Sequence, residues 1–187
     1  IKEIKKSVFD SPLLPHQESG IRDSCALPYQ LHADGKLNDD KKTFDIVFSA
    51  SNGMFGAQSA GSPFNVYVPG KYESNNKDNQ TRYENVKAWS YAVRAGDEIG
   101  AQWRLENFEN NLYHLRVYGP NGFFREFSGD KNDPLVIIKF DYEQVKSTSQ
   151  KFTGNVILQL KNLNEENHTI EIIDNSYKNE NQSFVLN

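Results

Sequence analysis

The residues whose side chains could do chemistry are few in this sequence, and they are widely separated. The four histidines are His16, His32, His114 and His168, and none lies three to five residues from another or from Cys25, the single cysteine. Structural zinc sites need closely spaced imidazole and thiolate ligands. We therefore predict no metal site built on these residues, and we expect His114 to be an exposed strand residue.

Oxygen ligands cluster once, in the inter-strand segment that holds Asp34, Asn38, Asp39 and Asp40. Calcium takes about six to eight oxygen ligands, so such a cluster could hold it. The spacing does not match an EF-hand loop, and a solvated turn is the favoured interpretation. We find no nucleophile elbow, phosphate-binding loop, dinucleotide fingerprint or zinc-protease helix. The sequence thus predicts no catalytic residue, no cofactor and no metal.

Large apolar residues in turn-rich segments are the remaining candidates, and they would serve binding. Met54 and Phe55 lie in a loop of Ser, Gly and Ala, and Phe123 and Phe124 follow a turn. Such side chains can enter a lipid interface or a partner's pocket. They can equally close the end of a β-sandwich. We name all four as candidate lipid or partner contacts and keep the packing alternative open.

The most informative stretch is a hairpin at residues 112–127. Tyr113, Leu115 and Val117 alternate with polar residues before the turn Gly-Pro-Asn-Gly. Asn121 and Gly122 tolerate the positive φ that tight hairpin turns need, and Pro120 fixes the entry. We therefore predict two antiparallel strands joined at Pro120, Asn121 and Gly122, whose role is structural.

Composition agrees with a sheet protein that does not bind nucleic acid. The chain has 187 residues, a net charge of -4 and 12% aromatic residues. Phe and Tyr in this proportion favour strands, and a nucleic-acid module would show a basic face. No apolar run approaches the about 20 residues of a membrane span. The chain does not begin with Met, and we expect it to be part of a longer protein.

Period-2 patterning predicts an all-β, antiparallel, immunoglobulin-like β-sandwich over residues 27–130. A short strand at residues 29–33 opens it, and a long polar loop at 69–87 interrupts it. Residues 1–26 lack alternation and read as a linker or the tail of a preceding domain. The inward positions that we expect on the central strands are Phe44, Ile46, Phe48, Phe64, Val66, Val68, Trp89, Tyr91, Val93, Ile99, Ala101, Trp103 and Leu105.

A second, partial β repeat is predicted at residues 135–187. Val156, Leu158 and Leu160 lie 110 positions after Ile46, Phe48 and Ala50. Counterparts of the Trp103 strand and of the closing hairpin are absent, so the second copy is truncated. We expect this half-sandwich to leave an apolar face uncovered.

These segments also resemble a known family. Residues 15–20 with Arg22 and 26–34, residues 90–97, the hairpin at 113–125 and residues 173–177 together resemble the C-terminal region of bacterial phosphocholine-type phospholipases C, non-haemolytic and haemolytic. The resemblance implies tandem β repeats behind an N-terminal hydrolase domain that holds the catalytic groups. It therefore implies a non-catalytic accessory region of a secreted or periplasmic enzyme that cleaves phosphatidylcholine-type lipids.

In that reading the partners are the catalytic domain of the same chain and a phospholipid surface. The region would buttress the catalytic domain or aid lipid contact. The alternative is a free-standing adhesive or carbohydrate-binding β-sandwich, which would display coplanar aromatic side chains. Trp89 and Trp103 are the candidates for such a display, and both read as core residues.

Overall fold

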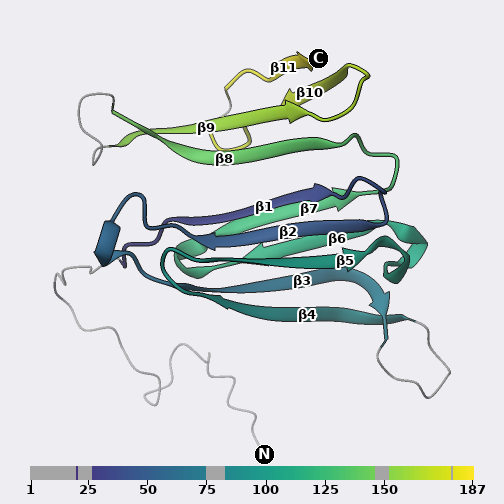
Figure 1. Cartoon of the computed structure of the whole chain (residues 1–187), viewed down its shortest axis with the longest axis horizontal. Coiled ribbons are helices and arrows are strands. Elements are labelled where there is room, and N and C mark those ends of the chain that lie inside the picture. Colours follow the sequence, from purple (N-terminus) through teal and green to yellow (C-terminus); the bar gives the residue numbers. More distant parts are fainter. Residues whose placement is uncertain (1–19, 21–26, 75–82, 146–151, 178) are drawn as a thin grey trace, which may run out of the picture.

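A computed structural model describes residues 20, 27–74, 83–145, 152–177 and 179–187, and this part of the chain is built from antiparallel strands (Figure 1). Its only helical pieces are short 3-10 turns, so the described residues contain no helix long and apolar enough to cross a membrane. The all-β prediction is confirmed. The linker predicted at residues 1–26 lies outside the described residues, apart from Gly20.

Seven strands form two packed sheets, as the sequence predicted. One sheet has the order β1-β2-β5 and the other the order β4-β3-β6-β7, with every neighbour antiparallel. The sheets face each other as a sandwich (Figure 1). The strands are β1 (Leu31–Leu37), β2 (Thr43–Ala50), β3 (Ser62–Glu73), β4 (Tyr83–Val93), β5 (Glu98–Arg104), β6 (Tyr113–Tyr118) and β7 (Phe124–Gly129).

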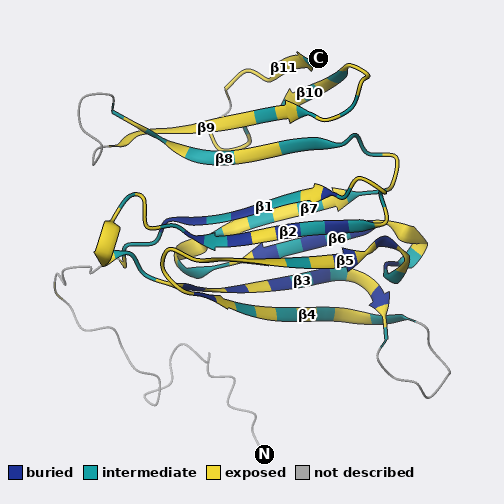
Figure 2. Ribbon diagram, in the orientation of Figure 1, coloured by how far each residue is buried: buried dark blue, intermediate teal, exposed yellow. Residues whose placement is uncertain are grey.

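The core lies between these two sheets and uses alternate residues of each strand (Figure 2). Alternation places successive side chains on opposite faces, so one face of each sheet becomes apolar. Phe48 and Phe64 meet across the sandwich with ring centroids 5.3 Å apart, and Trp89 meets Trp103 edge to face at 5.7 Å. Trp103 is buried and Trp89 is half-buried. Both indoles therefore belong to the packed interior, as predicted.

Two of the predicted boundaries were wrong. The first strand runs from Leu31 to Leu37 rather than over 29–33. The strand continues through Gly35, where the Phe127 ring fills the inward position. A Cβ at Gly35 would lie only 2.7 Å from that ring. The predicted loop at 69–87 contains the ends of β3 and β4, and its polar residues surround a register shift between Val68 and Lys71.

One inward prediction was also wrong. Ile99 is exposed to 39% because β5 is an edge strand, whereas Trp103 on the same strand is buried.

Residues 136–186 add two strand pairs, β8–β9 and β10–β11. Their apolar side chains remain accessible, with Val156 exposed to 50% and Phe184 to 44%. The uncovered apolar face expected from the sequence is thus present. The strands are β8 (Val136–Gln144), β9 (Phe152–Asn162), β10 (His168–Ile172) and β11 (Gln182–Leu186).

Strand β8 lies beside β1, and a small group of side chains joins the two. His32 Nδ1 contacts the carbonyl oxygen of Phe140 at 3.2 Å. The guanidinium of Arg125 lies over two rings, 4.8 Å from the centroid of Phe123 and 4.5 Å from that of Phe140. Burial lowers the pKa of Arg125 and raises the pKa of Asp34 nearby. Arg125 is therefore a cationic bridge between the seven-stranded sandwich and β8.

Candidate functional site

The candidate contact residues lie at one end of the sandwich, which we call the loop end and define as residues 51–61, 94–97 and 118–124 (Figure 1). The first of these loops is held against the segment that enters β1. Ser51 N donates to the carbonyl oxygen of Gln30 at 2.8 Å, and Met54 N donates to its side-chain Oε1 at 2.9 Å. Ala60 N donates to the carbonyl oxygen of Pro28 at 3.1 Å. The loop therefore has a fixed base.

The turn at 119–123 has the geometry that the sequence predicted. Asn121 has φ of 56° and Gly122 has φ of 76°. Phe123 N donates to the carbonyl oxygen of Pro120 at 3.1 Å, and Gly119 N donates to that of Phe123 at 2.9 Å. Two successive positive φ values match the twist of the flanking strands. The structural assignment of Pro120, Asn121 and Gly122 is consistent with this geometry.

The four candidate contact residues divide into two kinds. Phe55 is exposed to 37% and Phe124 to 40%, whereas Met54 and Phe123 are half-buried. Phe123 turns inward, with its ring 5.7 Å from that of Phe64 in an edge contact. The outward-facing candidates at this end are therefore Phe55 and Phe124.

Sequence reasoning missed a third exposed aromatic residue near the loop end. Tyr118 is exposed to 41%, pairs with Phe124 across β6 and β7, and has its ring centroid 5.2 Å from that of Phe124. Its outward position in the alternation of the hairpin was the available signal. Phe55, Tyr118 and Phe124 are called the loop-end aromatics below.

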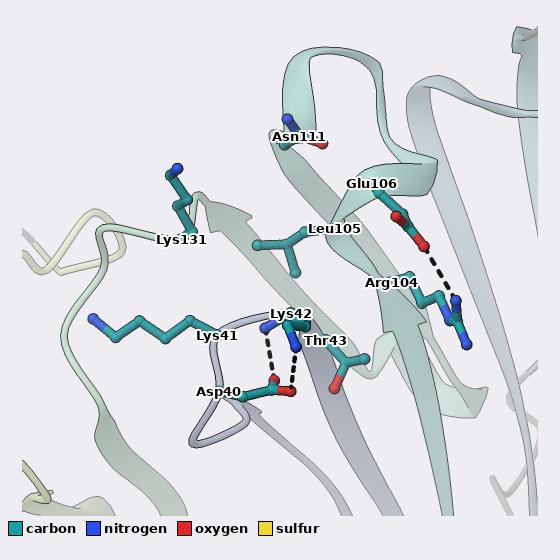
Figure 3. A pocket seen from close by; sticks show the side chains of 9 residues that line it. All are labelled: Asp40, Lys41, Lys42, Thr43, Arg104, Leu105, Glu106, Asn111 and Lys131. Carbon is teal, nitrogen blue, oxygen red and sulfur yellow. Dashed lines mark hydrogen bonds and ion pairs between the residues drawn. The ribbon is translucent and has the colours of Figure 1, made fainter.

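A second feature lies at the opposite end, where the β1–β2 turn meets the end of β5 and the segment after β7 (Figure 3). A recess of about 390 Å³ there has Leu105 in its lining and basic side chains around it. We call it the basic recess. Its charged lining residues are Asp40, Lys41, Lys42, Arg104, Glu106 and Lys131.

The four oxygen-bearing residues that we considered for calcium do not all lie in one turn. Asp34 lies within β1, away from the turn that holds Asn38 and Asp40. In that turn, Asn38 Oδ1 accepts from Lys42 N at 3.1 Å, and Asp40 Oδ1 accepts from the same N–H at 3.0 Å. These hydrogen bonds to Lys42 lower the pKa of Asp40. Across the described part of the chain, no three His, Cys, Asp or Glu side chains converge on a metal-sized site.

His114 lies on the outer face of β6, where a charged group surrounds Glu126. His114 Nε2 lies 2.6 Å from Glu126 Oε1, and Arg116 Nε lies 2.7 Å from the same oxygen. The hydrogen bonds from His114 and Arg116 lower the pKa of Glu126. These side chains are solvent-accessible, so the group adds at most a small stabilisation to the hairpin surface.

Comparison with known proteins identifies the family that the chain matches. Residues 24–130 match the family described as bacterial phospholipase C, C-terminal domain. The non-hemolytic phospholipase C of Burkholderia pseudomallei is 28% identical over 156 residues, 80% of this chain and 18% of that protein.

Two proteins of Pseudomonas aeruginosa match similarly. Its non-hemolytic phospholipase C is 30% identical over 88% of this chain and 21% of that protein. Its hemolytic phospholipase C is 28% identical over 83% of this chain and 21% of that protein. The chain thus spans about a fifth of the length of these relatives. No solved structure matches the chain.

Proposed function

The chain belongs to the family of bacterial phospholipase C C-terminal domains, and from this we propose that it is a non-catalytic accessory region of a larger phospholipase C. In this proposal the remainder of the parent enzyme hydrolyses the phosphodiester of phosphatidylcholine-type lipids. The parent acts outside the cytoplasm, secreted or periplasmic. Residues 27–130 form the first β-sandwich repeat and residues 135–187 a second, partial one, after a linker at 1–26.

The observation that carries the proposal is the exposure of the loop-end aromatics on a firmly held scaffold. Aromatic side chains at exposed turns favour the lipid–water interface, where the ring is partly buried and the tip stays wet. A net charge of -4 disfavours attraction to anionic membranes, which is driven by basic segments. A zwitterionic phosphatidylcholine surface needs no such charge. We therefore propose that the loop end contacts phosphatidylcholine surfaces during catalysis by the parent enzyme.

A buttress for the catalytic domain is the second role that an observation favours. The loop at 51–61 is hydrogen-bonded to residues 28 and 30, through which the chain enters the sandwich. A domain placed before residue 27 would therefore lie near the loop end. If it packs there, the loop-end aromatics serve the interface between domains rather than the lipid.

The adhesive or carbohydrate-binding alternative has less support. A sugar-binding surface uses exposed aromatic faces, but Trp103 is exposed to only 2% and Trp89 packs edge to face on it. Blue-shifted indole emission that resists a soluble quencher would agree with this packing. Strong quenching of both indoles would revive the alternative.

Co-sedimentation with phosphatidylcholine vesicles tests the lipid role directly. We expect the 187-residue chain to sediment with these vesicles, and a Phe55→Ser/Phe124→Ser variant to remain in the supernatant. Equal sedimentation of the two proteins would contradict lipid contact at the loop end.

A further inference from the structure

The basic recess carries a local charge opposite to that of the whole chain. Four of its lining side chains are cationic and two are anionic, in a protein whose net charge is -4. The cations come from three segments that are far apart in the sequence, at positions 41 and 42, 104 and 131. The fold therefore gathers positive charge around one recess, although basic residues are scattered along the chain.

Both acidic side chains of the recess already have cationic partners. Asp40 Oδ2 lies 3.5 Å from Lys42 Nζ, and Glu106 Oε1 lies 3.1 Å from Arg104 Nη1. Among the residues that the structure describes, Lys41 Nζ donates only to a neutral acceptor, the carbonyl oxygen of Asp133, at 2.9 Å. The charge of Lys41 is thus not neutralised by a carboxylate of the recess.

Lys131 is the second unneutralised cation. Within the described ranges its side chain forms no hydrogen bond or ion pair. The acids beside it in sequence are engaged, because Asp133 Oδ2 accepts from the Tyr113 hydroxyl at 2.7 Å and Asp130 Oδ1 accepts from Asn132 N at 2.6 Å.

Figure 3 shows Lys41 and Lys131 on one side of Leu105, with the Arg104–Glu106 pair on the other. Two ammonium groups on the same side can each donate to one polyoxygen anion, and the aliphatic lysine stems offer an apolar surface beside it. A volume of about 390 Å³ suits a small molecule rather than a polymer. We propose that the basic recess binds a phosphate-bearing small anion between Lys41 and Lys131.

The phosphate could belong to a soluble phosphate ester or to a lipid head group. The turn and strand ends that line the recess lie at the end of the sandwich opposite to the loop end (Figure 1). Strands of seven residues, such as β1 and β5, span roughly 23 Å at about 3.3 Å per residue. A loop end in contact with a membrane would leave the recess facing water, which favours a soluble ester. The inference stands independently of that membrane contact, because it rests on the recess alone.

Backbone-amide NMR titration of the 187-residue chain tests the proposal. Inorganic phosphate and phenyl phosphate are added at matched ionic strength, with chloride as the reference anion. We expect saturable shifts at residues 40–42, 104–106 and 131 for the phosphates and none for chloride. A Lys41→Gln/Lys131→Gln variant should bind at least about fivefold more weakly. A control variant, Lys36→Gln/Lys161→Gln, has the same net charge as Lys41→Gln/Lys131→Gln and should bind phosphate as tightly as the unmodified chain.

Lys131→Gln alone is a second variant in case the double variant misfolds, since the Lys131 side chain forms no hydrogen bond or ion pair with the described residues; it should also bind phosphate more weakly than the unmodified chain. Equal weakening in both double variants, or shifts without saturation, would overturn the proposal. Vesicles that contain phosphatidylglycerol distinguish the source of the phosphate. Binding that fails in Lys41→Gln/Lys131→Gln would assign a lipid head group, whereas binding that persists would place lipid contact elsewhere and leave the soluble ester as the ligand.

Discussion

Replacing Phe55 with Ser tests the lipid role of the loop end in quantitative terms. Phe55 is exposed to 37%, and an aromatic side chain presents about 200 Å² in all, so about 75 Å² remains accessible. Burying this area at about 25 cal/mol per Å² would contribute about 2 kcal/mol, or about 25-fold in partition. We therefore expect Phe55→Ser to reduce partition into phosphatidylcholine vesicles by up to about 25-fold, measured by co-sedimentation over a lipid titration.

The same substitution also reports whether Phe55 closes the end of the sandwich. A loop residue with this exposure should cost less unfolding free energy than the about 3–5 kcal/mol of a core Phe truncation. The matched control is Leu112→Ser, which removes an apolar side chain exposed to 53% at the opposite end. It should leave partition unchanged. Equal losses of partition in the two variants, or a core-sized loss of stability in Phe55→Ser, would refute the reasoning.

Three further predictions concern stability. Gly122→Val should lower the free energy of unfolding by about 1–2 kcal/mol in denaturant titrations, because a φ of 76° is strained for any residue with a side chain. The control Gly100→Ala should not lower it, since Gly100 has open space around it and an ordinary φ. Equal effects of the two substitutions would remove the tight-turn interpretation. Arg125→Ala should increase amide hydrogen exchange in β8 but not in β2, because the bridge to β8 is lost; unchanged β8 exchange would refute that role. The hydrogen bond from His114 lowers the pKa of Glu126 in the folded chain. The ionised Glu126 therefore stabilises the fold at neutral pH, and this stabilisation is lost on acidification below about pH 5, as Glu126 becomes protonated. Glu126→Gln should flatten this part of the melting-temperature profile, and an unchanged acid limb would contradict the assignment.

The sandwich itself was predictable because its strands alternate cleanly. Tyr113, Leu115 and Val117 are all buried, and their polar neighbours face outward, so the period of two placed the hairpin correctly. The alternation pattern failed to predict a strand where a side chain from another strand fills the core position that the strand's own residue leaves empty. Gly35 is such a position, since the Phe127 ring occupies the space that its side chain would take. A single strand's pattern cannot reveal that substitution.

The candidate site was predictable only in part, for a related reason. The loop and the turn that hold Phe55 and Phe124 could be read locally, but their meeting at one end depends on how β3 pairs with β6. The basic recess was not foreseeable, because Lys41 and Lys131 are brought together by the packing of the chain after β7 against the β1–β2 turn. From the sequence, the acidic residues of that segment were interpreted as a solvated turn, with a calcium site as the less favoured alternative.

The most direct test of an accessory role compares the parent enzyme with and without residues 27–187. Hydrolysis of a soluble choline-phosphate ester and of phosphatidylcholine vesicles is measured side by side, together with the melting temperature. We predict that deletion lowers the vesicle rate and preserves the soluble-ester rate. Joint collapse of both rates and of thermal stability would instead assign a buttress and remove the lipid contact. Unchanged rates on both substrates, or hydrolysis by the isolated chain, would contradict the account.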